Sequence, residues 1–127
     1  MKRTSLSAGE IIRALLSKDE DIKKLGVTKI FPIVADVAKL PYISYRRASL
    51  EPLALKNGNA DTVSIEVLCF TDTYPKSISL AEAVRNVLDG AQIDVDGLRM
   101  RSCLLSASEE DWQNDAFIQQ LVFTIKI

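Results

Sequence analysis

The chain has 127 residues, with 16 Lys and Arg side chains against 17 Asp and Glu side chains, and it contains no histidine. A formal net charge of −1 argues against a general nucleic-acid-binding protein, which normally carries a strong basic excess. The lack of histidine removes the usual general base near neutral pH and the commonest zinc ligand, which argues against an enzyme.

Hydrophobic residues make up 47% of the sequence and charged residues 26%, the balance of a soluble globular protein. We expect one domain over residues 1–127, because two separate cores would each be too small to be stable. No apolar run approaches the ~20 residues of a membrane span, and the start MKRTSLSAGEIIRALL lacks an apolar stretch of signal-peptide length. We therefore expect the protein to stay in the cytoplasm of the cell that makes it.

Residues 7–26 have the pattern of an amphipathic helix. Ser7 and Glu10 have the spacing of a capping box, in which a hydroxyl and a carboxylate satisfy free amide donors at a helix start. Ser17 and Glu20 repeat that spacing, so we expect the helix to restart there. The apolar positions at helical spacing are Ile11, Ile12, Leu15, Leu16, Ile22 and Leu25.

The middle of the chain predicts β-strands. Residues 27–34 are short, apolar and β-branched, with Pro32 marking the edge or the end of a strand. Residues 42–47 form a second strand, and residues 48–61 carry turn chemistry in the sequence Asn-Gly-Asn. Residues 62–71 alternate most cleanly, and one face of that strand carries Val63, Ile65, Val67 and Cys69.

A second helix is expected from about Lys76 to Asp89, closed by Gly90. Its apolar stripe consists of Leu80, Val84, Val87, Leu88 and Ala91. A short strand then leads into Asp96-Gly97, the favoured sequence for a two-residue hairpin turn. Residues 98–107 are expected to form the returning strand of that hairpin.

Residues Glu109 to Asp115 are expected to form an acidic loop around Trp112, followed by a long last strand over 117–127. On the inward face of that strand Gln119 is the polar exception. The whole order predicts an α+β fold, with a largely antiparallel β-sheet and two helices packed on one face.

The sequence offers little for catalysis or metal binding. Asp94 and Asp96 are the best candidates for a catalytic pair of carboxylates, but they flank a hairpin turn, where acids are normally solvated. The acids of residues 109–115 lack the spacing of a calcium-binding loop, and the glycines are too scattered to cradle a phosphate. Cys69 and Cys103 lie in apolar runs, where free cysteines behave as small buried hydrophobes. We expect no catalytic residue, no metal ligand and no cofactor.

Two groups of side chains favour a binding role. One group combines aromatic and basic side chains, namely Tyr42, Tyr45, Arg46 and Arg47. This combination is found on surfaces that stack nucleic-acid bases. The alternative explanation is a half-buried strand with solvated arginines, which fits a nearly neutral chain. Arginines beside aromatics are also enriched at protein interfaces. Trp112 beside acids is a second interface candidate, unless it covers the end of the core.

The order of several segments is similar to the tail completion proteins of long-tailed phages, the tail-terminator or tail-to-head joining family of virions and prophages. The segments are EIIRALLSKDEDIKKL, KIFPIVA, LPYISYRRAS, NGNAD and TVSIEVLCFTDTYPKSISLAEAVRNVLDG, and the resemblance extends over residues 10–127. It implies a mixed α+β fold and a non-enzymatic role. It also implies a hexameric ring that ends the tail tube and presents a surface to the head–tail connector.

A ring of identical subunits needs two different complementary patches on each subunit, which an exposed edge strand and a loop supply. We therefore predict contacts between subunits, or with the tail tube protein, along residues 46–61 and around the hairpin at Asp96. The candidate interface residues are Arg46, Arg47, Glu51, Lys56, Asn57, Asp94, Asp96 and Trp112.

Two other functions remain open at this point. One is a cellular adaptor or regulatory α+β domain that binds a protein or a small ligand and stays monomeric or dimeric. The other is an enzyme that uses a lysine or a carboxylate, which would require a desolvated group in a deep pocket. A monomer in solution is compatible with the ring, since many ring proteins close only on their template.

Overall fold

The computed structural model describes residues 3–33, 39–55 and 58–127. Its elements are η1 (Ser5–Ser7), α1 (Ala8–Lys18), α2 (Glu20–Lys24), β1 (Ile30–Pro32), β2 (Tyr42–Glu51), β3 (Ala54–Leu55), β4 (Gly58–Asn59), β5 (Thr62–Thr71), α3 (Tyr74–Leu88), β6 (Ile93–Val95), β7 (Leu98–Met100), β8 (Ser102–Gln113) and β9 (Ala116–Lys126). No helix among the described residues is long and apolar enough to cross a membrane.

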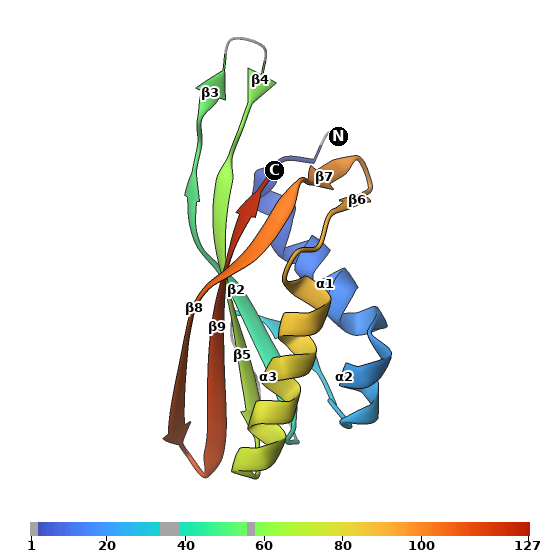
Figure 1. The fold of residues 1–127 in the computed structure, drawn as a ribbon, viewed down its shortest axis with the longest axis vertical. Coiled ribbons are helices and arrows are strands. Elements are labelled where there is room, and N and C mark those ends of the chain that lie inside the picture. Colours follow the sequence, from blue (N-terminus) through green and yellow to red (C-terminus); the bar gives the residue numbers. More distant parts are fainter. Residues whose placement is uncertain (1–2, 34–38, 56–57) are drawn as a thin grey trace.

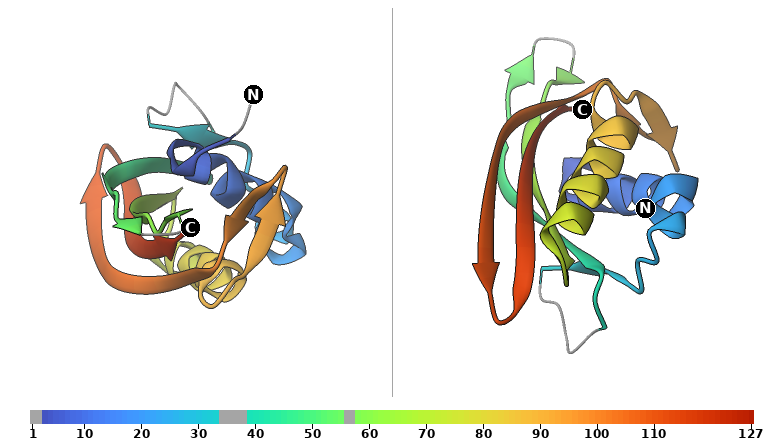
Figure 2. Two further views of the ribbon diagram at one scale, coloured as in Figure 1. Left: turned by 90° about the horizontal axis from the view of Figure 1, so that it is seen from above. Right: turned by 60° about the horizontal axis from the view of Figure 1, so that its bottom comes forward.

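The main sheet has the strand order β1-β2-β5-β9-β8, so β1 and β8 form its two edges. The pairs of β2 with β5, β5 with β9 and β9 with β8 are antiparallel, whereas β1 pairs with β2 in parallel. The helices lie on one face of this sheet (Figures 1 and 2). The predicted α+β class is therefore confirmed.

The core lies between the helices and the inner face of the sheet. The alternation predicted for β5 is confirmed, because every second side chain from Val63 to Cys69 is fully buried. Beneath the helices these side chains meet the inward side chains of β9, including Phe123 and Ile125. The helical stripes supply the opposite layer, namely Ile11, Ile12, Leu16, Ile22, Leu80, Val84 and Leu88.

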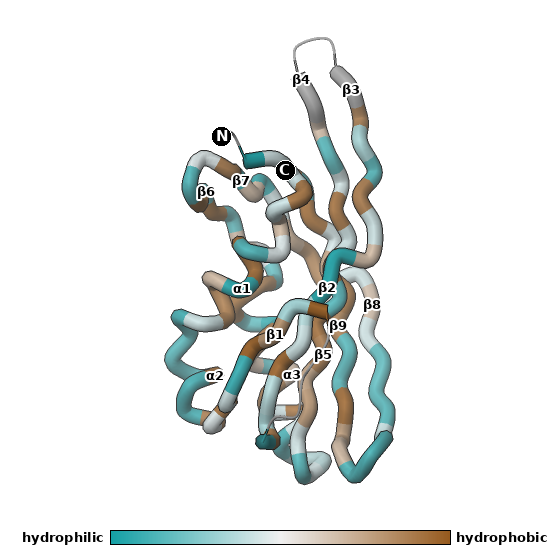
Figure 3. Tube along the Cα trace, turned by 180° about the vertical axis from the view of Figure 1, so that it is seen from behind, coloured by the Kyte–Doolittle hydropathy of each residue, from teal (hydrophilic) through white to brown (hydrophobic). Residues whose placement is uncertain are grey.

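The expectation of an acidic loop at residues 109–115 is wrong. β8 continues to Gln113 and pairs with β9 down to Ala116, so that only Asn114 and Asp115 form the turn, both with positive φ. The acids are tolerated in this strand because β8 is an edge strand, and charges on an edge discourage pairing with other chains. β8 and β9 thus form a long hairpin with a hydrophilic turn (Figure 3).

Two further expectations about the sheet need correction. β6 and β7 pair only with each other, so this hairpin stands apart from the main sheet instead of extending it. β2 continues past Arg47 to Glu51, with a register shift between Arg47 and Ser49, and β3 pairs with β4 beyond it. The described residues of the segment, 48–55 and 58–61, therefore continue the β2–β5 hairpin.

The helix ends also differ from the predicted capping boxes. Ser7 occupies the N-cap position of α1 but makes no side-chain capping bond, and Glu10 is paired with Arg3. α2 begins as a separate helix, as expected, but its cap is Asp19, whose carboxylate accepts a hydrogen bond from the Ile22 amide at 3.0 Å. The helix predicted from about Lys76 is α3, which begins slightly earlier, at Tyr74, and is capped by Thr73.

Candidate assembly interfaces

The first candidate surface is the outer part of the β2–β5 hairpin, which we call the β2–β5 arm (residues 46–53 and 60–66). Its residues 46–51 and 62–66 pair within the main sheet, and β3 and β4 continue from them past the sheet at the top of Figure 1. Arg46 forms an ion pair with Glu66 on the neighbouring strand, with Nε and Oε2 2.7 Å apart, and this contact raises the pKa of Arg46. Glu51 is exposed at the end of β2. Lys56 and Asn57, the other predicted residues of this segment, lie outside the described residues.

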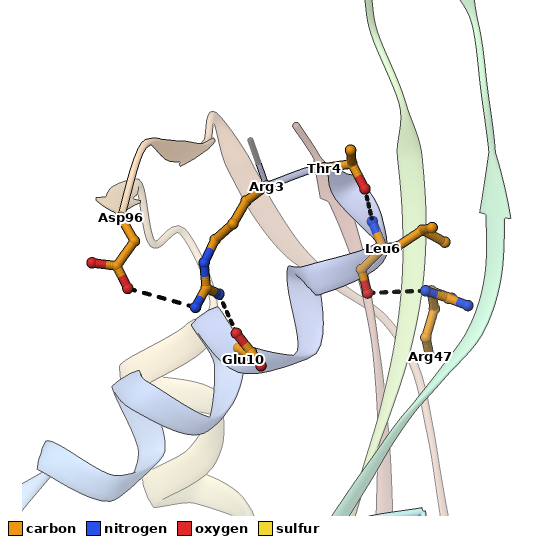
Figure 4. Close-up of polar contacts among 6 residues, drawn as sticks. All are labelled: Arg3, Thr4, Leu6, Glu10, Arg47 and Asp96. Carbon is orange, nitrogen blue, oxygen red and sulfur yellow. Dashed lines mark hydrogen bonds and ion pairs between the residues drawn. The ribbon is translucent and has the colours of Figure 1, made fainter. Parts of the chain in front are cut away.

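Arg47 points from the base of this arm toward the start of the chain. Its Nη1 donates a hydrogen bond of 3.0 Å to the backbone carbonyl of Leu6, which η1 places beside β2 (Figure 4). The Leu6 side chain itself is 63% exposed. Arg47 therefore fixes the first residues described by the structure against the arm.

The same N-terminal segment also reaches the second candidate surface, the β6–β7 hairpin. The guanidinium of Arg3 contacts both Glu10 and Asp96, with 3.7 Å between Nη2 and the Asp96 carboxylate (Figure 4). Asp96 sits in the turn with a positive φ, as expected for an Asp-Gly hairpin. The fold thus brings Arg47 and Asp96 to one end of the molecule through residues 3–10, although they are far apart in sequence.

Asp94 lies opposite Arg99 on β7, and its carboxylate is exposed. Neither Asp94 nor Asp96 is enclosed, and Asp96 has a cation as its neighbour. General acid catalysis requires a desolvated or coupled pair. This hairpin is therefore suited to surface contacts.

Trp112, the third candidate, lies at the opposite end of the molecule, near the tip of the β8–β9 hairpin. It is 54% exposed and sits across from Phe117 on β9. The Phe117 ring meets Tyr74 of α3 edge to face, with 5.9 Å between ring centroids. Phe117 and Tyr74 thus form an aromatic contact at the start of α3, across from the exposed Trp112.

A polar network lies next to this aromatic group. The carboxylate of Glu110 accepts hydrogen bonds from the buried Gln119 amide at 3.0 Å and from the Tyr74 hydroxyl at 2.9 Å. These two bonds lower the pKa of Glu110, and the contact with Glu110 raises the pKa of Tyr74. Gln119 also donates to the Ser77 hydroxyl at 3.1 Å. Gln119, the polar residue on the inward face of the last strand, therefore links β9 to both β8 and α3.

One surface was missed by the sequence analysis. A groove of about 470 Å³ lies between α1, α2 and β1, and its partly exposed apolar lining includes Val27, Ile30 and Phe31. Arg13, Lys23 and Lys29 also line it. Residues 18–29 contain four lysines and three acids, and the approach of Lys23 and Lys29 to Arg13 depends on how α2 folds back.

Metal-ligand groups and disulfides are absent from the part of the chain that the structure describes. No three His, Cys, Asp or Glu side chains there gather as a metal site. Cys69 and Cys103 are free and buried, and burial raises the pKa of each thiol to about 12. They lie on β5 and β8, which are separated by β9, so the interpretation as buried hydrophobes is confirmed.

Comparison with known proteins gives a family match and a similar solved structure. The family model described as Tail completion protein gp17 matches residues 10–127. The fold is similar to that of a chain from the virion of a native gene transfer agent (GTA) particle, with a TM-score of 0.79 and 18% identity over 91% of this chain and 90% of that chain. No curated protein matches the sequence. Because the family model matches nearly the whole sequence, the chain belongs to the tail completion protein gp17 family and is a structural component of a phage-type tail.

Proposed function

We propose that this protein completes a phage or prophage tail as a hexameric ring, which caps the tail tube and joins it to the head. The observation that carries this proposal is the family match over residues 10–127. The partners would be other copies of the chain, the tail tube protein and the head–tail connector. The chain would be made in the cytoplasm of the bacterial host and end in the tail of the virion.

The distribution of the candidate residues supports a role between two partners. Arg47 and Asp96 lie at one end of the molecule, whereas Trp112 lies at the other (Figure 1). A protein between a tube and a connector needs two unlike contact surfaces, one for each neighbour. The β2–β5 arm and the turn of the β8–β9 hairpin are suited to this because they lie toward opposite ends of the sheet.

The character of the exposed groups supports a non-enzymatic role. Asp94 and Glu109 are exposed carboxylates, and both thiols are buried with raised pKa values. The groove beside α1 is lined by cations, apolar side chains and the hydroxyls of Ser17 and Thr28, without a carboxylate among the described residues that line it. Such a groove suits the binding of a protein segment.

Electron microscopy of particles produced with this gene deleted tests the proposal. We expect overlong tails if the ring stops tube growth, or headless tails of normal length if it acts mainly in joining. A plasmid copy of the wild-type gene is the matched control, and it should restore joined, infectious particles.

Normal infectious particles from the deletion strain would overturn the proposal and favour a cellular adaptor role. Gold labelling of a tagged chain gives an independent readout, because a ring at the end of the tube places all label at one end of the tail. Label spread along the tail would contradict the capping role.

A further inference from the structure

The outer face of the main sheet, which is the face away from the helices, carries an apolar row that crosses several strands. Tyr42 on β2 is paired with Phe70 on β5, and Phe70 is paired with Ile118 on β9. The row ends on β8, where Asp111 is paired with Ile118. Paired residues point to the same face of a sheet, and their neighbours along each strand point to the other. Gln119, the neighbour of Ile118, is bonded to α3, so the row faces away from the helices (Figures 1 and 2).

The aromatic part of this row is held in a fixed arrangement. The rings of Tyr42 and Phe70 are stacked, with 4.6 Å between centroids, and Phe31 of β1 meets Tyr42 edge to face at 6.0 Å. All three side chains are partly exposed. A surface whose side chains are already ordered loses little conformational entropy when a partner binds.

Two adjoining hollows lie on this row, beside the turn of the β8–β9 hairpin. The first has a volume of about 250 Å³ and reaches Tyr42 and Phe70, and the second has a volume of about 200 Å³ and reaches Leu68. Gln113 and Ile118 line both, so the two hollows form one surface. We call it the outer-face hollow, and its side chains that matter below are Tyr42, Leu68, Phe70, Glu109, Asp111 and Ile118.

One wall of the outer-face hollow is negatively charged. Glu109 and Asp111 are exposed on the outer face of β8. The Asp111 carboxylate accepts hydrogen bonds from the Trp112 backbone amide at 2.8 Å and from the Gln113 side-chain amide at 2.9 Å. Neither acid forms an ion pair within residues 3–33, 39–55 and 58–127. The described residues that line the hollow include no lysine or arginine, so its charge is left for a partner to neutralise.

The third acid of the lining, Glu110, is already engaged on the inner face of the sheet. Its carboxylate accepts the hydrogen bonds from Gln119 and from Tyr74 described above. The charge offered on the outer face therefore belongs to Glu109 and Asp111.

A second copy of this chain is a poor match for the hollow. Of the large apolar side chains that are exposed in the described part of the chain, only Tyr74 has a lysine or arginine within two positions in the sequence. That residue, Lys76, is paired with Asp72. Leu6 lies beside Arg47 in space, but this guanidinium donates to the Leu6 carbonyl. The complementary combination of an apolar side chain and a free cation must come from a different protein.

We propose that the outer-face hollow binds a segment of another tail protein that presents an apolar side chain within a few positions of a lysine or arginine. The apolar side chain lies on Phe70 and Ile118, and the cation faces Glu109 and Asp111. A purely apolar segment would desolvate these acids without pairing them, and an acidic segment would be repelled, so the wall selects the partner. Because the partner is a tail protein, the inference rests on the proposed function, but it does not depend on how many subunits form the ring.

Photo-cross-linking in assembled particles tests the proposal. Gln113 is exposed and lines both hollows, so p-benzoylphenylalanine is placed there in a plasmid copy that complements the gene deletion. Ala107, exposed on the same face of β8 but outside the hollow, is the matched control position. Mass spectrometry should find position 113 joined to a peptide of a different tail protein, with a lysine or arginine within about four residues of the attachment point, the span of one helical turn. Position 107 should give little of this product.

Two pairs of variants in this background test the chemistry of the contact. Glu109→Lys should reduce the yield of the cross-link about tenfold, because an attraction to the partner's cation becomes a repulsion, whereas Glu82→Lys, exposed on α3, should leave it unchanged. Ile118→Thr should also reduce the yield, since it places a hydroxyl in the apolar floor, and Val122→Thr is its control on the same face of β9. Thermal unfolding of the free chains verifies that each variant is folded.

The outcomes separate this inference from the proposed function. A cross-link to a second copy of this chain, or to a segment without lysine or arginine, would overturn the partner chemistry, and so would a yield that Glu109→Lys does not change. Tails that contain the substituted chain but give no product from position 113 would overturn the hollow as a docking site and leave the tail completion role standing. Absence of the wild-type chain from purified particles would overturn both.

Discussion

The side-chain amide of Gln119 donates a hydrogen bond to the carboxylate of Glu110, with 3.0 Å between Nε2 and Oε2. The same nitrogen lies 3.1 Å from the Ser77 hydroxyl, so one buried amide joins β9 to both β8 and α3. Gln119 is only 8% exposed, and a buried amide of this kind must be satisfied within the protein. This residue positions the base of the β8–β9 hairpin against the helix.

Replacing Gln119 with Leu should lower the free energy of unfolding by about 1 kcal/mol, because hydrogen bonds to Ser77 and Glu110 are lost while a similar volume is kept. Urea unfolding followed by circular dichroism measures the change. Gln120→Leu is the matched control on the other face of β9, and it should change stability less. Equal effects of the two substitutions would show that the network adds no stability.

The Asp89 carboxylate ties the end of α3 to β8, and it should make stability depend on acid pH. The Leu105 amide donates to it at 2.9 Å, and this bond, together with Arg85, lowers the pKa of Asp89 below its ordinary value of 3.8. A carboxyl whose pKa is lower in the folded state stabilises the protein above its unfolded-state pKa. This stability is lost as the pH falls through the folded-state value.

Asp89→Asn keeps an acceptor for the Leu105 amide but removes the charge. We expect wild type to be the more stable of the two near neutral pH, and the difference to shrink below about pH 4, the ordinary range of an aspartate pKa. Thermal unfolding over a pH series measures this, with Asp94→Asn as an exposed control. A difference that stays constant down to strongly acid pH would contradict the linkage.

The residue that caps α2 differs between the structure and the prediction from sequence. Asp19→Ala should destabilise the protein by about 1 kcal/mol, because the Ile22 amide loses its acceptor. Ser17→Ala should have almost no effect, since the structure places Ser17 inside α1 and not at a cap. Denaturant titration of both variants checks this, and the reverse order of stability would favour the capping box predicted from sequence.

The two thiols should be unreactive in the folded chain. Burial raises the pKa of Cys69 and Cys103 to about 12, so almost no thiolate is present near neutral pH. A chromogenic disulfide reagent should therefore label neither residue without denaturant and both in urea. Rapid labelling of one thiol in native buffer would mean that its strand opens.

Reversing the charges of Arg46 and Arg47 to Glu tests the β2–β5 arm. We expect a folded protein that enters particles poorly, because the arm loses its positive surface and the Glu66 ion pair becomes a repulsion. Arg46→Glu with Glu66→Arg is the control that keeps the pair within the arm. Normal incorporation of the Arg46→Glu and Arg47→Glu chain would remove this arm from the assembly surface.

The sequence by itself determined the features that depend on neighbours along the chain. The alternation around Val67 predicts a strand buried on one face, and the helical stripe around Leu80 predicts the second helix, because each period follows from local geometry. The Asp96-Gly97 turn was equally local, since its backbone requires residues that tolerate positive φ. The α+β class follows from the order of such elements.

Only the tertiary structure decided the features that depend on partners distant in sequence. The acids around Trp112 lie in a strand because β9 pairs with them, and backbone pairing leaves no periodic signal in an exposed edge strand. Arg3 pairs with both Glu10 and Asp96, the second of them distant in sequence, and the predicted capping box does not form. The groove between α1 and β1 arises in the same way, because a surface formed by several elements exists only after they have packed together.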